Sequence, residues 1–196
     1  MVEQLQNIII GLGYAGVGGA IFAESGLFFG AFLPGDSLLF TVGLLASQGD
    51  FNIAILWSIV VVMAVLGDNV GYMFGKMVGP KIFTKEDSLL FRKSHVIKAD
   101  AFYQKHGKKA IVLARFVPII RTFAPIIAGV ARMEYHTFFL FNVIGGVTWG
   151  TLLLSAGYSV GHYIPGADKY LEWIIIAIIV LSILPIAIEY YHRRKD

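Results

Sequence analysis

The stretch "FLPGDSLLFTVGLLA", residues 32–46, decides how this chain folds. It is almost wholly apolar, yet a proline, a glycine and an aspartate stand in its first half. Pro34 and Gly35 form a strong turn signal, and Asp36 can accept hydrogen bonds from the free amides of a following helix. The apolar arms on both sides are each long enough for half of a membrane crossing. We therefore expect a re-entrant hairpin that enters from the outer side and has its tip at Pro34 and Gly35.

The composition places the whole chain in a membrane. Of its 196 residues, 57% are hydrophobic and 15% are charged, and the mean hydropathy is +0.71, whereas soluble domains are about 45 to 50% apolar. No polar stretch is long enough to form a separate soluble domain, so residues 1–196 are expected to form a single membrane domain. The absence of cysteine excludes disulfides and thiol-ligated metals.

Three segments have the length of an ordinary transmembrane helix. They are residues 53–74, 138–163 and 170–191, each near the ~20 residues that cross the hydrocarbon. A fourth segment, residues 110–131, is as long but contains two arginines and two prolines. These charged and helix-breaking residues make the segment unsuited to a simple transmembrane helix.

The distribution of basic residues indicates how this fourth segment runs. Residues 76–109 and the C-terminal "HRRKD" are both basic and are expected in the cytoplasm by the positive-inside rule. If residues 110–131 crossed the membrane, the C-terminus would lie outside. If they enter and return, the two later spans bring it back inside. We therefore expect a second re-entrant hairpin, with Pro118 and Pro125 near its tip, in a place where protein or water covers the backbone.

An internal repeat supports two equivalent halves. The pattern Gly-Tyr-x-x-Gly occurs at Gly71 and again at Gly157, 86 positions later, and the same offset pairs Gly43 with Gly129. Each half would hold one hairpin and one crossing, so the second half is inverted relative to the first, as in many transporters. The expected fold is all-α, with repeat 1 over about residues 1–80, repeat 2 over about 86–166, and a C-terminal transmembrane helix over 170–191.

An amphipathic segment precedes each hairpin. Residues 88–106 combine apolar positions at helical spacing with many basic ones and are expected to lie flat on the inner leaflet. Residues 2–12 are either a weaker counterpart on the outer leaflet or the start of a true span. The net charge of +3 and the clustered basic residues favour contact with anionic lipids rather than nucleic acid.

Five ionisable side chains lie inside apolar stretches: Glu24, Asp36, Asp68, Arg115 and Arg121. Each costs about 2.5 to 3.5 kcal/mol to place in a membrane, so they need partners or a wet cavity. Two acids belong to the first hairpin and both arginines to the second. If the two tips meet at the midplane, acids and bases pair there and relieve most of the desolvation cost.

These residues suggest a chemistry. Guanidinium groups suit bidentate recognition of phosphate, so Arg115 and Arg121 are the candidate phosphate ligands. Burial disfavours a charged carboxylate, so Glu24 and Asp36 are candidates to take up protons and couple them to phosphate binding unless the arginines hold them. The alternative is that these groups are structural salt bridges. Asp68 is a weaker candidate, because it could equally cap a helix or pack against the hairpins.

Other chemistries lack support in the sequence. The five histidines do not have the spacing of a metal-binding helix, so neither a metal nor a cofactor is expected. The nucleotide-binding and serine-hydrolase motifs are absent. A lipid-phosphate phosphatase would need a positioned histidine nucleophile, which the chain does not offer. The protein is therefore not expected to be an enzyme.

At these same residues the chain resembles a known family. Glu24, then "FLPGDSLLF" at 32–40, "GDNVGYMFGK" at 67–76 and "KHGKKAIVLARFVPIIRTFAPIIAGVARM" at 105–133 together resemble the DedA family, also described as SNARE-associated or VTT-domain proteins. The resemblance covers roughly residues 20–163. It implies two opposed re-entrant hairpins and lipid translocation. Bacterial members are similar to flippases for undecaprenyl phosphate, and eukaryotic relatives look like phospholipid scramblases. The family's acidic pair and arginine pair correspond to Glu24 with Asp36 and to Arg115 with Arg121.

The leading hypothesis is a proton-coupled flippase for a polyprenyl phosphate in a bacterial cytoplasmic membrane, with the basic loop 76–109 and the C-terminus inside. Its partners would be the lipid phosphate, protons and anionic lipids, and a homo-oligomer is left open. The alternatives are a proton-coupled antiporter of small cations or cationic drugs, and a general phospholipid scramblase.

Overall fold

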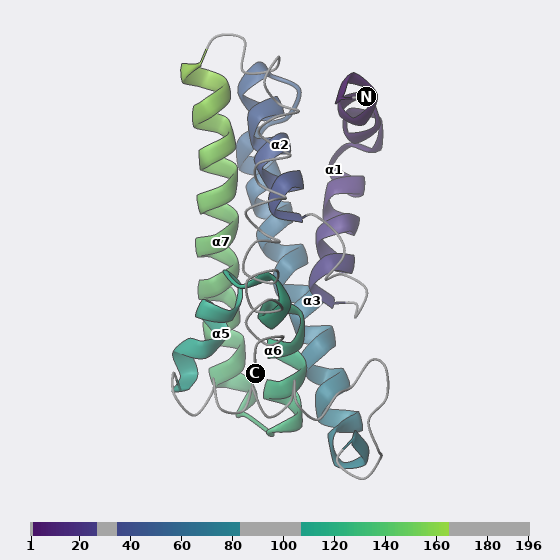
Figure 1. The fold of residues 1–196 in the computed structure, drawn as a ribbon, viewed down its shortest axis with the longest axis vertical. Coiled ribbons are helices and arrows are strands. Elements are labelled where there is room, and N and C mark those ends of the chain that lie inside the picture. The colour runs from purple at the N-terminus through teal and green to yellow at the C-terminus, as the bar shows by residue number, and fades with distance from the viewer. Residues whose placement is uncertain (1, 27–34, 83–106, 165–196) are drawn as a thin grey trace, which may run out of the picture. The chain divides into compact units, whose positions relative to one another are not determined.

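The computed structural model describes residues 2–26, 35–82 and 107–164, which form helices and no strand (Figure 1). The expected all-helical fold is confirmed for these residues. The elements are α1 (Val2–Gly26), α2 (Gly35–Gln48), α3 (Ile53–Ile82), the 3-10 turn η2 (Gly107–Lys109), α5 (Ala110–Ala114), α6 (Pro118–Val130) and α7 (Tyr135–Tyr163).

Several predicted features fall outside the described residues. They are the tip residue Pro34, the amphipathic segment 88–106, most of the basic loop 76–109, the transmembrane helix 170–191 and the C-terminal "HRRKD". These remain predictions.

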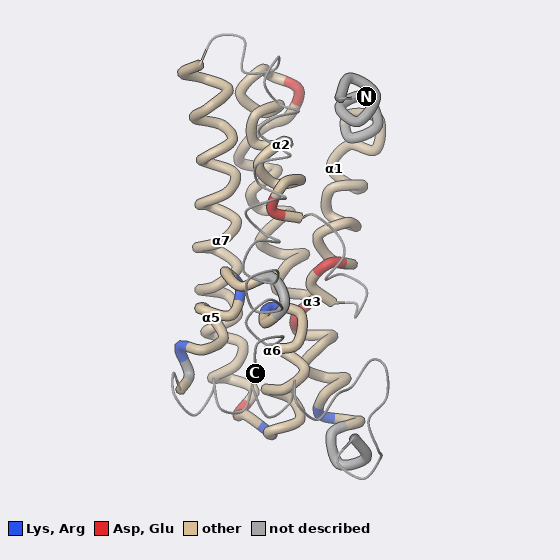
Figure 2. The backbone as a smooth tube through the Cα atoms, viewed as in Figure 1, with Lys and Arg blue, Asp and Glu red and all other residues tan. Residues whose placement is uncertain are grey.

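Among the described residues, two helices have the length and composition of membrane spans. They cover Ile53–Val78 of α3 and all of α7, Tyr135–Tyr163, and include the predicted spans 53–74 and 138–163. Only 33% and 39% of their most apolar windows are buried inside the protein. Most of each apolar surface therefore has no protein cover among the described residues, which suits a lipid environment. Figure 2 shows how few charged residues interrupt these helices.

Helix α1 is bent at Gly13. This residue has φ 58° and ψ −155°, so two helical pieces join there across a kink. Glycine adopts this conformation without the steric cost that a side chain would bring.

The polypeptide breaks between α5 and α6, inside the segment expected to form the second hairpin. Val117 is extended, with φ −120° and ψ 107°, and Pro118 is the first residue of α6. A residue before proline is pushed out of the helical region, which explains the position of the break. Pro125, by contrast, lies within α6 rather than at the break. Its ring removes one helical hydrogen bond without ending the helix, and its place near the tip of a hairpin stays a prediction.

The chain divides into two compact units. The first consists of residues 1–17, 34–57 and 152–196, and the second of residues 18–33 and 58–151. Among the described residues of the first unit, α2 packs closely on the last turns of α7. A Cβ atom at Gly43 would lie 2.5 Å from the carbonyl oxygen of Leu154, and one at Gly157 would collide with the carbonyl oxygen of Phe40.

In the second unit, α6 packs against α3 in a similar way. A Cβ at Gly129 would collide with the carbonyl oxygen of Tyr72, and one at Gly75 with that of Ile126. Gly43 and Gly129, which are related by the 86-residue offset, thus serve like purposes, because each lets two helix backbones touch. The inverted repeat itself stays a prediction.

The core of the second unit joins α3, α5, α6 and α7. Tyr72, Ile111, Ala128 and Phe138 are buried together, and the rings of Tyr72 and Phe138 stack at 4.4 Å between centroids. This cluster fixes α5 and α6 against the two long helices. The positions of the two arginines, Arg115 after α5 and Arg121 in α6, depend on that packing.

Candidate functional site

The second unit gathers four of the five ionisable residues that lie inside apolar stretches. Glu24 is near the end of α1 and Asp68 is in α3, while Arg115 follows α5 and Arg121 is in α6. They line one small cavity together with Ser25 and Trp149. Residues from distant parts of the sequence therefore meet in one place.

Arg121 and Glu24 form the first ion pair. Nη2 of Arg121 donates to Oε1 of Glu24, although the two residues are 97 positions apart in the chain. The Glu24 side chain is 3% exposed and that of Arg121 is 15% exposed. The guanidinium carbon also lies 5.5 Å from the ring centroid of Trp149, within the range of a cation–π interaction.

Arg115 and Asp68 form the second ion pair, and it is the more deeply buried of the two. Nη2 of Arg115 donates to Oδ2 of Asp68, and their side chains are 6% and 7% exposed. The same nitrogen lies 2.5 Å from Oδ1 of Asn142 and 3.4 Å from the carbonyl oxygen of Ala64. Arg115 is thus held by several acceptors on two helices.

Asn142 connects this pair to the helix backbone. It is fully buried, and its Nδ2 donates to the carbonyl oxygen of Val65 at 3.1 Å while its Oδ1 faces Arg115. A buried amide with both of its ends engaged holds its neighbour in one orientation, because the alternative leaves polar atoms unpaired. Asn142 therefore positions Arg115.

Glycines leave room for the Arg115 side chain and for the end of α1. A Cβ at Gly145 would lie 3.0 Å from Cδ and 3.2 Å from Nε of Arg115. A Cβ at Gly67 would lie 2.7 Å from Cβ of Ser25, so this glycine lets the end of α1 approach α3 beside Glu24. Larger residues at either position would move a charged group.

The cavity between the pairs is small. It measures about 10 Å³, which is about the room that one water molecule needs. A phosphate group is larger than that, and each guanidinium already holds a carboxylate. An anion can enter only if a carboxylate gives way or the helices separate.

Two further described candidate residues, Asp36 and Gly35, belong to the first unit. Asp36 lies in the first turn of α2, in the first unit, so its part in the site stays a prediction, as does that of Gly35 at the start of the same helix. Among the described residues no group of three or more metal-ligating side chains occurs.

Sequence reasoning missed Asn142 and did not predict that Asp68 pairs with Arg115. Asn142 is an amide within the apolar stretch "FFLFNVIGG", and polar groups inside a membrane helix are costly enough to require a reason. A polar residue in this apolar stretch was therefore the feature by which Asn142 could have been identified from the sequence. Trp149 also lines the cavity and faces Arg121.

Two helices of membrane length and paired charges buried among them are typical of an integral membrane protein. A family model of the VTT domain matches residues 33–159. The chain belongs to this family, the DedA family, and the resemblance found in the sequence is confirmed.

Named relatives agree with a membrane location. The chain is 45% identical to protein DedA of Escherichia coli K12, over 89% of this chain and 80% of that protein. It is 46% identical to an uncharacterised membrane protein of Mycobacterium leprae, over 90% of this chain and 78% of the relative. It is 32% identical to the inner membrane protein YqjA of E. coli K12, over 94% and 86%. No solved structure matches the chain.

Proposed function

We propose that this protein moves a lipid phosphate from one leaflet of the membrane to the other, and that the lipid is a polyprenyl phosphate such as undecaprenyl phosphate. The observation that carries the proposal is the Arg121–Glu24 ion pair, which lies beside the Arg115–Asp68 pair in one small cavity. In this role the protein would return a carrier lipid for reuse in building the cell envelope.

Two neighbouring guanidinium groups favour a phosphate ligand. Each can offer a pair of N–H donors to the oxygens of a phosphate, and each keeps its charge when buried. An arginine pair in an apolar surrounding is costly unless an anion compensates it. In the closed arrangement Glu24 and Asp68 are those anions, so a lipid phosphate competes with a carboxylate.

The two arginines have different parts in this scheme. Arg115 is held by Asp68, Asn142 and a backbone carbonyl, so it supplies a fixed positive charge. Its Nε has no hydrogen-bond partner among the described residues, which leaves a donor for the ligand. Arg121 is the more exposed of the two, and the exchange of partners takes place there.

Charge balance couples this exchange to protons. When the phosphate accepts hydrogen bonds from Arg121, Glu24 loses its cation in a place where a bare carboxylate is costly. Glu24 then takes up a proton and becomes neutral. Release of the phosphate reverses both events, so lipid and proton move together. Asp36 would offer a second carboxylate for the same purpose.

The proposal also includes the two re-entrant hairpins expected from the sequence. The break between α5 and α6 would be the tip of a re-entrant hairpin, and the inverted counterpart would surround Pro34. The polyprenyl tail stays in the bilayer while the head group passes the two ion pairs. Irregular backbone at such depth is tolerated where it lines a polar passage.

A reconstituted system tests the proposal. The purified protein is placed in liposomes that contain undecaprenyl phosphate, and the lipid's appearance in the other leaflet is followed. The wild type should move the lipid, and the double variant Glu24→Gln/Arg121→Gln, which removes both charges and keeps polar side chains, should not. Lys109→Gln is the matched control, because this exposed lysine lies outside the cavity.

The outcomes separate the alternatives. Absence of movement by the wild type, or equal movement by the double variant, contradicts the proposal. Equal movement of phosphatidylcholine identifies a general scramblase. Collapse of a pH gradient on addition of small cations identifies an antiporter, and release of inorganic phosphate from the lipid identifies a phosphatase.

A further inference from the structure

A second and larger cavity lies at one end of the second unit. It measures about 340 Å³ and is formed by the last turns of α3, the loop between α6 and α7, and the first turn of α7. None of its residues lines the cavity around Arg121. We call it the end cavity, and its lining residues are Tyr72, Lys76, Arg132, Met133, Glu134 and Tyr135.

Arg132 occupies a conformation that favours glycine. Its φ is +52°, and it is the only non-glycine residue with positive φ in the described part of the chain. The amide of Met133 donates to the carbonyl oxygen of Ala128 at 2.9 Å, and that of Arg132 to Gly129 at 3.0 Å. This is the Schellman ending of a helix, in which the position of Arg132 is usually glycine. Glycine would cost the fold less than arginine at this position.

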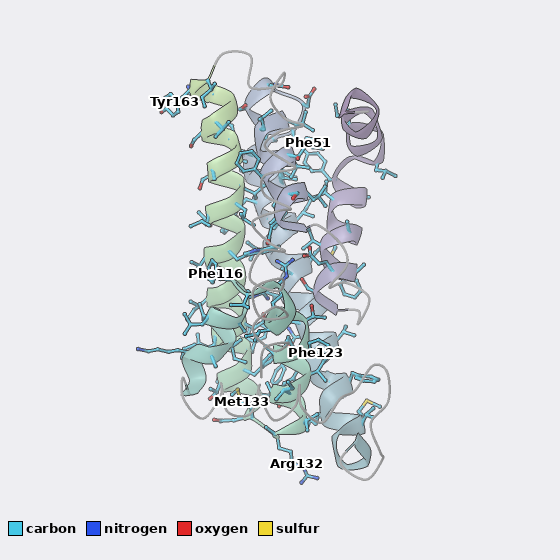
Figure 3. All side chains as sticks on the ribbon, viewed as in Figure 1. Phe51, Phe116, Phe123, Arg132, Met133 and Tyr163 are labelled. Carbon is cyan, nitrogen blue, oxygen red and sulfur yellow. The ribbon has the colours of Figure 1, made fainter. Side chains whose placement is uncertain are left out.

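The loop that carries Arg132 is fixed to α3. The hydroxyl of Tyr72 donates to the carbonyl oxygen of Met133 at 2.5 Å, while the Tyr72 ring stacks on Phe138. Arg132 and Lys76 are therefore presented to the same cavity by a rigid frame. Figure 3 shows Arg132 extending from this loop beside Met133.

The end cavity contains one acid as well as two cations. The carboxylate of Glu134 accepts a hydrogen bond from Oγ1 of Thr137 at 3.1 Å, and it stands just before the first turn of α7, where free amides favour negative charge. Glu134 thus has compensation of its own. Lys76 and Arg132 leave the cavity with a net positive charge.

The level of the cavity in the membrane follows from the two long helices. Lys76 interrupts the apolar sequence of α3, and α7 begins at Tyr135, so we place the cavity where hydrocarbon gives way to head groups. Large apolar side chains on the same turns point outward: Met73 (56% exposed), Met77 (78%), Phe139 (41%) and Leu140 (56%). The cations of the cavity match the anionic head group of a lipid, and the apolar surface beside them matches its acyl chains.

We propose that the end cavity binds the phosphodiester head group of an anionic membrane lipid, with Arg132 and Lys76 as its ligands. The rings of Tyr72 and Tyr135 form walls of the cavity, and the acyl chains lie against the exposed methionines and Phe139. This site does not depend on the transport of a polyprenyl phosphate, and it would hold the end of the second unit at the membrane surface.

Lipid retention by the purified full-length protein tests the inference. Native mass spectrometry in detergent counts bound phosphatidylglycerol, with phosphatidylcholine and inorganic phosphate as comparison probes. The wild type should retain phosphatidylglycerol in preference to phosphatidylcholine. Arg132→Gly and Lys76→Gln should each lower its affinity about tenfold, because each removes charged hydrogen bonds to phosphate.

Two features make the test decisive. Arg132→Gly relieves the left-handed conformation, so the lipid-free protein should melt at the wild-type temperature or above it. Lys109→Gln should retain phosphatidylglycerol, since this residue does not line the end cavity. Unchanged binding by Arg132→Gly, equal retention of phosphatidylcholine, or equal thermal protection by inorganic phosphate would overturn the assignment to an anionic lipid.

Discussion

Arg121 and Glu24 come from parts of the chain 97 residues apart and form an ion pair that is largely closed off from solvent. The pair stands beside a second one, Arg115 with Asp68, which is held by additional acceptors. In the proposed function the Arg115–Asp68 pair stays intact, and the Arg121–Glu24 pair exchanges its partner.

Glu24→Gln should uncouple transport from protons. The amide still accepts a hydrogen bond from Arg121, so the fold is kept, but it cannot take up a proton when a phosphate replaces it. Lipid phosphate movement in liposomes should therefore no longer respond to an imposed pH gradient. An unchanged response in this variant would show that Glu24 is not the proton carrier.

Removing Arg115 alone should be costly to the fold. Arg115→Ala leaves the buried charge of Asp68 without its partner, and loss of one member of a buried pair costs about 3 to 5 kcal/mol. The double variant Arg115→Met/Asp68→Leu replaces the pair by apolar groups and should recover most of that stability. Thermal unfolding in detergent measures both.

The same double variant separates stability from function. It should remain folded and fail to move lipid phosphate, because the fixed cation is gone. Wild-type transport by this variant would mean that Arg115 serves the fold alone.

Gly145→Ala should disturb Arg115 from the neighbouring helix. The added methyl would lie 3.0 Å from Cδ of Arg115, and such overpacking costs about 1 to 3 kcal/mol. Transport should fall while the protein stays folded. Gly19→Ala is the matched control, since open space surrounds that position. Equal effects of both variants would show that Gly145 does not act by leaving room for Arg115.

Asn142→Leu should weaken transport through Arg115 rather than by direct contact. Leucine keeps the volume but removes the acceptor at 2.5 Å, so the guanidinium is no longer held in one orientation. The apparent affinity for the lipid should fall more than the maximal rate, and Asn142→Gln should restore part of it. A fall confined to the maximal rate would point to a different role.

The long helices were predictable from sequence because length and hydropathy determine them. The predicted spans 53–74 and 138–163 lie within α3 and α7. The helix break was predictable only in part, since two prolines offered two places for it. Pro118 starts a helix after an extended residue, while Pro125 is absorbed within α6. Local propensity alone does not distinguish these outcomes.

The partners of the arginines were harder to predict. Charge signs suggested that acids of the first half meet arginines of the second, and Glu24 and Arg121 do meet. That Asp68 holds Arg115, with Asn142 beside it, depends on how the helices rotate and how closely they cross. Those details follow from contacts such as that of Gly145 with Arg115, which no sequence spacing reveals.

Proton uptake on binding of the lipid tests the central claim most directly. Calorimetry with undecaprenyl phosphate in buffers of different ionisation enthalpy gives the protons taken up per lipid bound, for the wild type and for Glu24→Gln. The account predicts that the wild type takes up about one proton more than the variant, because the phosphate displaces a carboxylate that must then be neutralised. Equal proton uptake by both proteins, with the lipid bound to each, would contradict it.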